Sequence, residues 1–367
     1  MGRNSRTIAS PIFRRSALAA LMAATASFPT ASLAWGSAGH QYVGNLAFAL
    51  LNPNARQHVR ALLGPTVTLG EAAVWPDCIR SVSGSPANGY SYHSDKYTPK
   101  ACAAFGNSPG EVQRMTDYAS RNWTNCDYSG HPTKCNLSYH FADVNVHLHS
   151  EYEASYFGAQ PYDVVHAIEA AEAVLKCKAG ERCAAPAPFS IADKSEALLL
   201  LAHFVGDVHQ PLHVGAIYVD AANAETGDDG APTVGGNFLL LPTTFHENLH
   251  HSWDEIASAL GTTPSAAAIH SACRIAPLPN PVADPPEKWA SESVVAARTA
   301  YDGMRYARDA AQPKDWDVQF ADPQGYGRTR RSLQAQRLIA AGARLAEILN
   351  SIWPSKKAAA ACEGALL

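Results

Sequence analysis

A histidine is followed four residues later by an aspartate at two places in this chain, as His203 with Asp207 and as His250 with Asp254. On a helix, residues four apart lie on the same face about one turn apart, so each pair can bind a common cation. A single pair of this kind is more often a surface ion pair. Two such pairs, with His213 close behind the first, favour metal binding instead.

The residues that follow the first pair predict how its helix ends. His209 lies two positions after Asp207, so it points away from the face that His203 and Asp207 share. Pro211 ends the helix and lets His213 turn back toward the metal site. His213 is therefore a candidate ligand and His209 is not.

Further candidate ligands lie in two short clusters, Trp75–Arg80 and Tyr139–Asp143, which are weak evidence when taken alone. Imidazoles and carboxylates without thiolates suit zinc in a catalytic role, with one coordination position open for water. Nine residues contribute to the inventory, and a catalytic zinc takes about three protein ligands, so more than one ion is indicated. The candidate ligands are Trp35, His40, Asp77, His140, His203, Asp207, His213, His250 and Asp254.

The first 34 residues have the composition of a secretory signal peptide. They contain four arginines and no acidic residue, and an apolar run over Ser16–Leu33 ends in Ser32-Leu33-Ala34. The run is too short and too rich in small residues for a membrane span. We predict cleavage before Trp35 and a periplasmic or secreted mature chain. Cleavage there creates a free α-amine five residues from His40, so the new N-terminus itself can bind a metal.

Charge and composition exclude other classes of protein. Removal of the four leader arginines takes the formal net charge from −4 to −8, so the mature chain lacks the basic surface of a duplex-binding protein. A hydrophobic content of 47% is ample for a core over residues 35–367. The mature chain has no predicted membrane span, and nothing in it indicates an obligate protein partner.

Eight cysteines in an exported chain predict disulfides more than thiolate metal sites, since no Cys-x-x-Cys sequence occurs. Cys177 and Cys183 flank a short turn-like segment and form the one predicted pair. The other six cysteines allow 15 complete pairings, which the sequence leaves open.

Helical periodicity is much stronger than strand alternation, so we predict a mainly α fold. Two long polar stretches, Ser83–Cys135 and Ala221–Gly236, are expected to be functional rims or disulfide-tied insertions. Pro277–Pro286 is a predicted connector, and Asn237–Pro242 is the best candidate strand. The predicted helices are Gln41–Leu63, Tyr162–Leu175, Asp193–His209, Lys288–Met304 and Thr329–Ile352.

Five motifs, in a fixed order, resemble those of the zinc-dependent single-strand nucleases of the S1/P1 type. They span Trp35 to Asp254, roughly two-thirds of the mature chain. The motifs are Trp-Gly-x-x-Gly-His from Trp35, His-Phe-x-Asp from His140, His-Phe-x-Gly-Asp-x-x-Gln-Pro-Leu-His from His203, Gly-Gly-Asn from Gly235 and Asn-Leu-His-x-x-Trp-Asp from Asn248.

The resemblance implies a single, mainly helical nuclease domain over residues 35–367, of the zinc phospholipase C and single-strand nuclease type, with long disulfide-tied loops. It also implies three zinc ions per chain. The implied ligands are Asp77, His140, His203 and Asp207 for one ion; the Trp35 amine and carbonyl, His40 and the bridging Asp207 for its close neighbour; and His213, His250 and Asp254 for a more distant ion.

The implied reaction is hydrolysis of single-stranded DNA, RNA and 3′-nucleotides to 5′-phosphate products. Asp77 and Arg80 are the implied catalytic residues, with the planar, permanently charged guanidinium of Arg80 on the phosphate. Phe141 and Asp143 match the family's nucleobase pocket. Because a stacked base must be unpaired, such a pocket explains a preference for single strands. Asn237 and Val234 are expected to complete the pocket.

The chain also departs from the family's pattern. Sixty-two residues separate Asp77 from His140, so Ser83–Cys135 is an insertion that we expect to reshape substrate access. A zinc-dependent phospholipase C is the nearest alternative, but the last ligand pair of those enzymes ends in glutamate where this chain has Asp254. They also lack the His-Phe-x-Asp pocket. A non-catalytic zinc-binding exported protein needs neither Arg80 nor this pocket.

Overall fold

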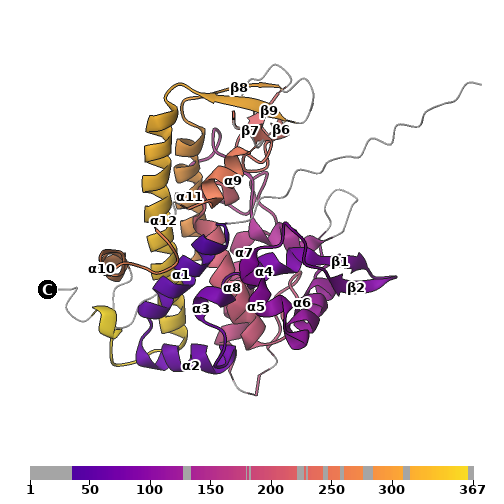
Figure 1. Ribbon diagram of the computed structural model, residues 1–367, viewed down its shortest axis with the longest axis vertical. Helices are drawn as coiled ribbons and strands as arrows, with labels where there is room; N and C mark the ends of the chain where they lie inside the picture. Colours follow the sequence, from indigo (N-terminus) through magenta and orange to yellow (C-terminus); the bar gives the residue numbers. More distant parts are fainter. Residues whose placement is uncertain are drawn as a thin grey trace, which may run out of the picture. The chain divides into compact units, whose positions relative to one another are not determined.

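Helices dominate the part of the chain that the computed structural model describes, and the predicted mainly α fold is confirmed (Figure 1). The described residues are 35–126, 134–178, 180–181, 183–220, 227–228, 230–242, 247–256, 260–275, 284–308 and 315–362. The predicted signal peptide lies outside these ranges. The helices are α1 Ser37–Ala49, α2 Pro53–Leu63, α3 Leu69–Ala72, α4 Trp75–Cys78, α5 Ala103–Gly106, α6 Pro109–Arg121, α7 Val164–Lys176, α8 Lys194–His209, α9 Leu249–Asp254, α10 Ala266–Ile275, α11 Pro286–Tyr301 and α12 Pro323–Ile352.

The strands are short and form small separate sheets. β1 (Val82–Ser85) pairs antiparallel with β2 (Gly89–Tyr92), and β3 (Val144–Asn145) pairs parallel with β4 (Gly215–Ala216). The remaining strands are β5 Tyr218–Val219, β6 Ala231–Pro232, β7 Leu239–Leu240, β8 Met304–Arg308 and β9 Trp316–Phe320, in the orders β5-β6 and β7-β9-β8. Short 3₁₀ helices are η1 Ile79–Ser81, η2 Lys100–Cys102, η3 Cys135–His140, η4 Pro211–His213 and η5 Ala360–Cys362.

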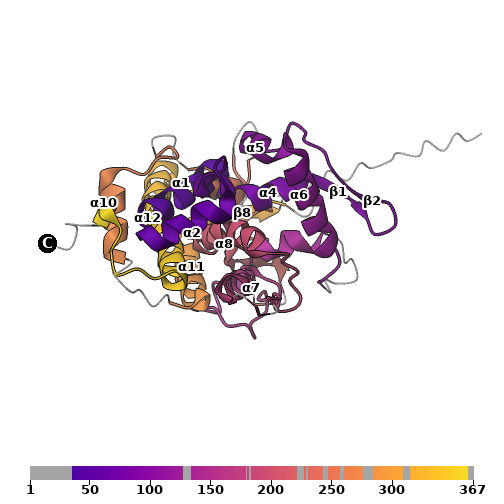
Figure 2. The same cartoon turned by 90° about the horizontal axis from the view of Figure 1, so that it is seen from below.

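Helix α8 occupies the centre of the helical core. Every residue from Glu196 to His209 is buried, as expected for a helix that is apolar on almost all sides. α8 contacts α1, α2, α3, α4, α7, α11 and α12, and both views place it among these helices (Figures 1 and 2). Polar side chains on α8 are therefore surrounded by protein.

The predicted helix over Gln41–Leu63 is wrong, because α1 ends at Ala49 and α2 begins at Pro53. Asn52 precedes the proline, and its side chain accepts a hydrogen bond from the Ala55 amide at 2.9 Å. An asparagine cap followed by proline at the first helical position starts a new helix, which overrides the apolar periodicity across the break.

The other predicted helices are present with shifted ends. α7 and α8 match their predictions closely, and α12 begins earlier, at Pro323. α11 ends at Tyr301, so the predicted extension to Met304 is wrong, and Met304 instead starts β8. The expected strand over Asn237–Pro242 is reduced to the two residues of β7. Parts of Ala221–Gly236 and Pro277–Pro286 lie outside the described residues.

The stretch Ser83–Cys135, expected to be a functional rim or a disulfide-tied insertion, contains β2, α5 and α6. The helix α6 was not predicted because most of its residues are polar, although it buries Met115 and Tyr118 on one side. Disulfides hold this stretch as expected, and the predicted pair Cys177–Cys183 is confirmed. The other bonds are Cys78–Cys102, Cys126–Cys135 and Cys273–Cys362. Among the described residues, no helix has the length and apolarity that a bilayer crossing requires.

Candidate metal centre

Three groups of buried histidine and aspartate side chains meet around α8. In each group the potential ligand atoms lie within 4.8 Å of one another. They come from α1, α4, η3, α8, η4 and α9, and thus from segments far apart in the sequence. The first group is Asp77, His140 and His203; the second group is His40, His203 and Asp207; and the third group is His213, His250 and Asp254.

Backbone carbonyls set the orientation of three of the imidazoles. The Nδ1 atoms of His203, His213 and His250 lie 2.7, 2.7 and 2.9 Å from the carbonyl oxygens of Ala73, His140 and Gly235. A carbonyl only accepts hydrogen bonds, so each Nδ1 carries the proton. In the neutral ring, Nε2 then presents a lone pair, which is the tautomer of a metal-binding histidine.

These lone pairs lie close to other nitrogen and oxygen atoms of the groups, and His140 Nδ1 lies 2.9 Å from His203 Nε2 and 3.0 Å from Asp207 Oδ2. The Nε2 atoms of His213 and His250 are 3.0 Å apart, and His203 Nε2 lies 3.1 Å from Asp207 Oδ2. Two acceptors at this distance repel unless a proton or a metal ion lies between them. Ligand atoms about 2.0–2.1 Å from a tetrahedral zinc are roughly 3.3 Å apart, so the spacing fits a shared ion.

Asp77 and Asp207 are fully buried, and only one of their four carboxylate oxygens, Asp207 Oδ2, has a hydrogen-bond partner among the described donors, His140 Nδ1 at 3.0 Å. Both oxygens of Asp77 and Oδ1 of Asp207 accept no hydrogen bond. Burial raises the pKa of Asp77 to about 6 and raises the pKa of Asp207 well above its ordinary value. A buried carboxylate oxygen without a hydrogen-bond partner is costly, so these three oxygens suit a site that binds a cation.

Burial also keeps the histidines neutral. It lowers the pKa of His40, His203 and His213, and it lowers the pKa of His250 to about 4. The charge of Arg80 adds to this effect on the last three of these residues. Arg80 therefore lies close enough to act electrostatically on the first and third groups. It is in η1, directly after α4, and the resemblance implied that it binds the phosphate.

Trp35 and His40 meet α8 at Gly206. The indole Nε1 of Trp35 donates to the Gly206 carbonyl at 2.8 Å, and Trp35 is fully buried. A Cβ atom at position 206 would lie 2.9 Å from Nδ1 of His40. Only glycine lets the His40 ring approach the helix this closely. The backbone amide of Gly36 also donates to the Asp254 carbonyl at 3.0 Å, which holds this N-terminal segment beside the third group.

The predicted base-pocket residues converge beside the metal groups. The Gly235 amide hydrogen-bonds to the Asp143 carboxylate, while burial raises the pKa of Asp143 to about 7. Val234 has a φ of 51°, an uncommon conformation for a β-branched residue. Asn237 Nδ2 donates to the Val234 carbonyl at 2.9 Å, which stabilises this turn. Phe141, next to the ligand segment, is only partly buried.

Several supporting residues were missed in the sequence analysis. Gln210 donates to Asp254 Oδ1 at 2.7 Å and accepts from the Leu212 amide at 2.6 Å, so it joins α8, η4 and α9. Its place inside the His203–His213 motif was the available signal. Arg337 and Arg344 are buried on α12, and both bind Glu292 of α11. Their spacing of seven residues on an otherwise apolar face was the signal there.

His209 lies outside the three groups, as its position two residues after Asp207 predicted. Its Nδ1 lies 2.7 Å from the Val205 carbonyl, and its Nε2 accepts from Arg344 at 2.8 Å. Burial, together with Arg337 and Arg344, lowers the pKa of His209 and keeps the ring neutral. His209 thus joins the last turn of α8 to α12.

Comparison with known proteins assigns these motifs to one family. The model of the S1/P1 nuclease family matches residues 35–354. Endonuclease 4 of Arabidopsis thaliana is 33% identical over 186 residues, which cover 44% of this chain and 52% of that protein. Endonuclease 1 of Arabidopsis thaliana is 29% identical over 191 residues, or 45% of this chain and 52% of that protein. The chain spans about half the length of the curated relatives it matches.

We predict that His209→Ala lowers stability without lowering metal content. The change leaves a buried Arg344 donor unpaired, which costs about 1–3 kcal/mol of unfolding free energy. Urea unfolding and elemental analysis measure the two effects. His209→Gln, which can keep an acceptor, is the matched control and should be less destabilised. Loss of bound metal in His209→Ala would contradict the assignment of His209 to the α8–α12 contact.

Proposed function

Because the chain belongs to the S1/P1 nuclease family, we propose that it is a zinc-dependent hydrolase that cleaves phosphodiester bonds in single-stranded DNA and RNA to 5′-phosphate products. We further propose that it removes phosphate from 3′-nucleotides. The observation that carries the proposal is the convergence of buried imidazole and carboxylate side chains in the three groups, near an arginine and beside the partly exposed ring of Phe141. An acidic chain of this kind needs a local cationic site to bind a polyanion.

The side chains present fit zinc by the chemistry of their donors. All three groups combine imidazole nitrogen and carboxylate oxygen without thiolate, as catalytic zinc sites do. We propose that His203 and the rest of the first group bind one ion together with Asp207. The second ion would be bound by His40, the shared Asp207 and the Trp35 amine and carbonyl, and the third ion by the third group. When bound, zinc would activate water near neutral pH and stabilise charge on the phosphate and the leaving oxygen.

Arg80 is the proposed phosphate clamp. It follows Asp77 by three residues, and its charge acts to lower the pKa of His140, Asp207 and His213, so it lies near the groups. A guanidinium donates two parallel hydrogen bonds to phosphate oxygens and stays protonated at every working pH. It would therefore hold the scissile phosphate and stabilise the charge that develops during displacement.

Phe141 and Asp143 are the proposed base platform, completed by Asn237 and Val234. A partly exposed ring can stack on any base, and a stacked base must leave a duplex. This requirement accounts for single-strand preference without a sequence code. The pocket carboxyl and the Asn237 amide would bind the base edge.

The location of the protein belongs to the same proposal. We propose that residues 1–34 are a signal peptide, removed before Trp35, and that the nuclease domain over residues 35–367 acts in the periplasm or outside the cell. Four disulfides among the described residues suit an oxidising compartment.

The proposal predicts zinc-dependent cleavage of single strands. The chain that begins at Trp35 should cleave a single-stranded oligonucleotide much faster than its duplex, lose activity to a chelator and regain it with added zinc. Gel analysis of 5′-labelled substrate measures each step, and phosphatidylcholine serves as the competing substrate. Hydrolysis of phosphatidylcholine without nuclease activity would overturn the proposal, as would full activity after metal removal.

The proposed role of the Trp35 amine predicts that processing creates a ligand. An α-amine has a pKa of about 7.7–8.0, so a metal displaces its proton easily near neutral pH. A chain with one extra residue before Trp35 offers an amide there, and should hold about one zinc fewer and show little activity. Elemental analysis of the two chains, which differ by a single residue, is the measurement. Equal zinc content and equal turnover would refute this ligand.

The proposed phosphate clamp predicts that Arg80→Lys keeps its zinc but loses turnover by about 10²–10³-fold, because lysine lacks the planar fork. Steady-state kinetics on a dinucleotide and elemental analysis measure both properties. Arg114→Lys, which changes a partly exposed arginine on α6, is the control and should stay active. Full activity of Arg80→Lys would remove Arg80 from the reaction.

The raised pKa of Asp143, about 7, predicts a pH-dependent base preference. Below that pH the protonated carboxyl can donate a hydrogen bond to a base edge, whereas above it the carboxylate only accepts. The ratio of cleavage rates on adenine-rich and uracil-rich strands should therefore change between pH 5.5 and 8.5, a span of roughly 1.5 units on each side. Asp143→Asn, which keeps a donor and an acceptor at every pH, should abolish the change. If the ratio in Asp143→Asn varied with pH as it does in the wild-type chain, the assignment would be contradicted.

A further inference from the structure

The segment that carries Asp77 and Arg80 has little structure of its own. It consists of α4, with four residues, and η1, with three. Helices this short are unstable without tertiary contacts. The Asp77 carboxylate accepts no hydrogen bond from the described protein, and its Oδ1 lies 4.0 Å from His203 Nε2. Its direction therefore depends on how the backbone at Asp77 is held.

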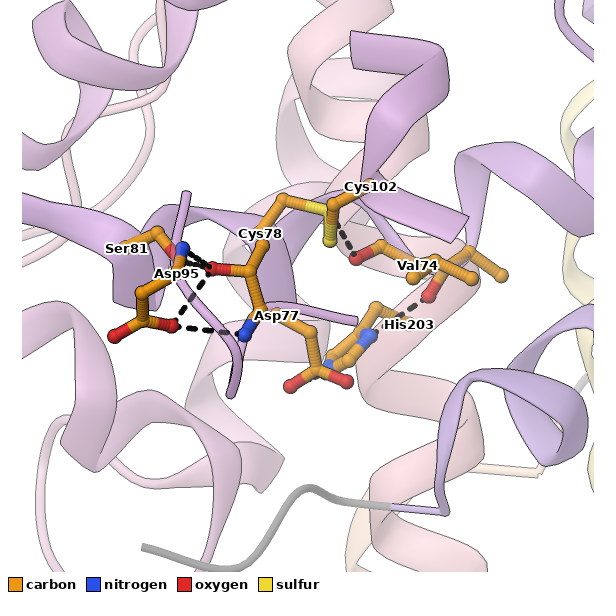
Figure 3. The surroundings of a disulfide bond; sticks show 9 residues. Val74, Asp77, Cys78, Ser81, Asp95, Cys102 and His203 are labelled. Carbon is orange, nitrogen blue, oxygen red and sulfur yellow. Dashed lines mark hydrogen bonds and ion pairs between the residues drawn. A yellow bond between two sulfur atoms is a disulfide. The ribbon is translucent and has the colours of Figure 1, made fainter. Parts of the chain in front are cut away.

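A disulfide holds the residue next to this ligand. Cys78 follows Asp77 directly and is bonded to Cys102 at the end of η2, inside the insertion (Figure 3). Both cysteines are fully buried. Figure 3 shows the Asp77 carboxylate on one side of this segment, next to His203, and the disulfide on the other.

The insertion that carries Cys102 is itself fixed to the central helix. Arg121, at the end of α6, donates to both carboxylate oxygens of Glu196 in the first turn of α8, at 2.7 and 2.8 Å. Next to it, Asn122 Nδ2 donates to the Ser190 carbonyl at 2.9 Å. The insertion is thus joined at one end to the first turn of α8 and, through the disulfide, to the segment of Asp77. Asp77 in turn faces His203, which also belongs to α8.

Aromatic packing completes this support. Trp75, in the first position of α4, is fully buried and packs edge-on against Tyr118 of α6, with ring centroids 5.5 Å apart. Ser81 Oγ and Thr98 Oγ1 are 2.8 Å apart on the other side of η1. The insertion therefore contacts the ligand segment before and after Asp77, and the disulfide is the covalent link between them.

We propose that the Cys78–Cys102 disulfide is a positioning element for the metal centre, which fixes the backbone at Asp77 so that its carboxylate meets His140 and His203. The inference rests on the proposed function, since it takes the first group to bind zinc. It also gives the insertion a second role besides substrate access, because the insertion carries Cys102, the cysteine that bonds to the residue after Asp77. Residues that orient ligands change metal affinity by about 10–100-fold when they are removed.

The test compares two disulfide deletions. Cys78→Ser with Cys102→Ser should stay folded, hold about one zinc fewer than the wild-type chain after dialysis against a weak chelator, and bind that ion about 10–100-fold more weakly. Added zinc should restore the missing ion. Circular dichroism, elemental analysis and a zinc titration are the measurements, so the result does not depend on activity.

Cys273→Ser with Cys362→Ser is the matched control. These cysteines are also buried, and their bond closes a loop of 89 residues against 24 for Cys78–Cys102. The entropic effect of a disulfide on the unfolded chain grows with loop length, so the control should lose at least as much stability. It joins α10 to η5, without a ligand neighbour, and should keep all of its zinc.

Equal zinc affinity in the Cys78/Cys102 variant and the wild type would overturn the inference, as would equal zinc loss in the control. If the serine variant does not fold, Cys78→Ala with Cys102→Val removes the buried hydroxyls, and its zinc affinity decides the question. Failure of both variants to fold beside a folded control would show a general structural crosslink and would also overturn it. A wild-type chain that binds no zinc would instead refute the proposed function.

Discussion

The structure depends on a cluster of buried imidazole nitrogens and carboxylate oxygens that lie close together around α8. Backbone carbonyls accept hydrogen bonds from the Nδ1–H groups of His203, His213 and His250, so the opposite nitrogens turn their lone pairs toward each other and toward buried carboxylates. Charge repulsion and desolvation make this arrangement unfavourable in the absence of a cation. The surrounding fold has to hold these groups together until positive charge compensates them, and this demand accounts for much of the architecture.

Helix α8 meets that demand by being buried on every side. It supplies His203 and Asp207 directly, and its end is held by two separate networks. Gln210 joins the turn after α8 to Asp254, while His209 accepts from Arg344, which is paired with Glu292. The first network orients a ligand, and the second joins the helix to α11 and α12. The hydrogen bonds and ion pairs of these arginines offset the cost of burying their charges.

Much of the centre could be predicted because its signals are local. The spacing of His203 and Asp207 on one helix, and the proline that turns His213 back, are short-range properties that the structure reproduces. Long-range contacts could not be predicted in this way. Nothing in the spacing shows that Cys78 bonds to Cys102, or that Arg344 reaches His209 from 135 residues away. The helix α6 was missed because its polar face dominates its composition, whereas the break before α2 was missed because a cap and a proline outweigh apolar periodicity.

The most direct test of the account is anomalous diffraction at the zinc edge from crystals of the chain that begins at Trp35. The account predicts three peaks: one between Asp77, His140 and His203, a second close to it beside His40 and Asp207, and a third between His213, His250 and Asp254. Absence of a peak at all three groups, with the imidazole nitrogens still facing one another, would contradict the claim that these buried lone pairs exist to hold metal.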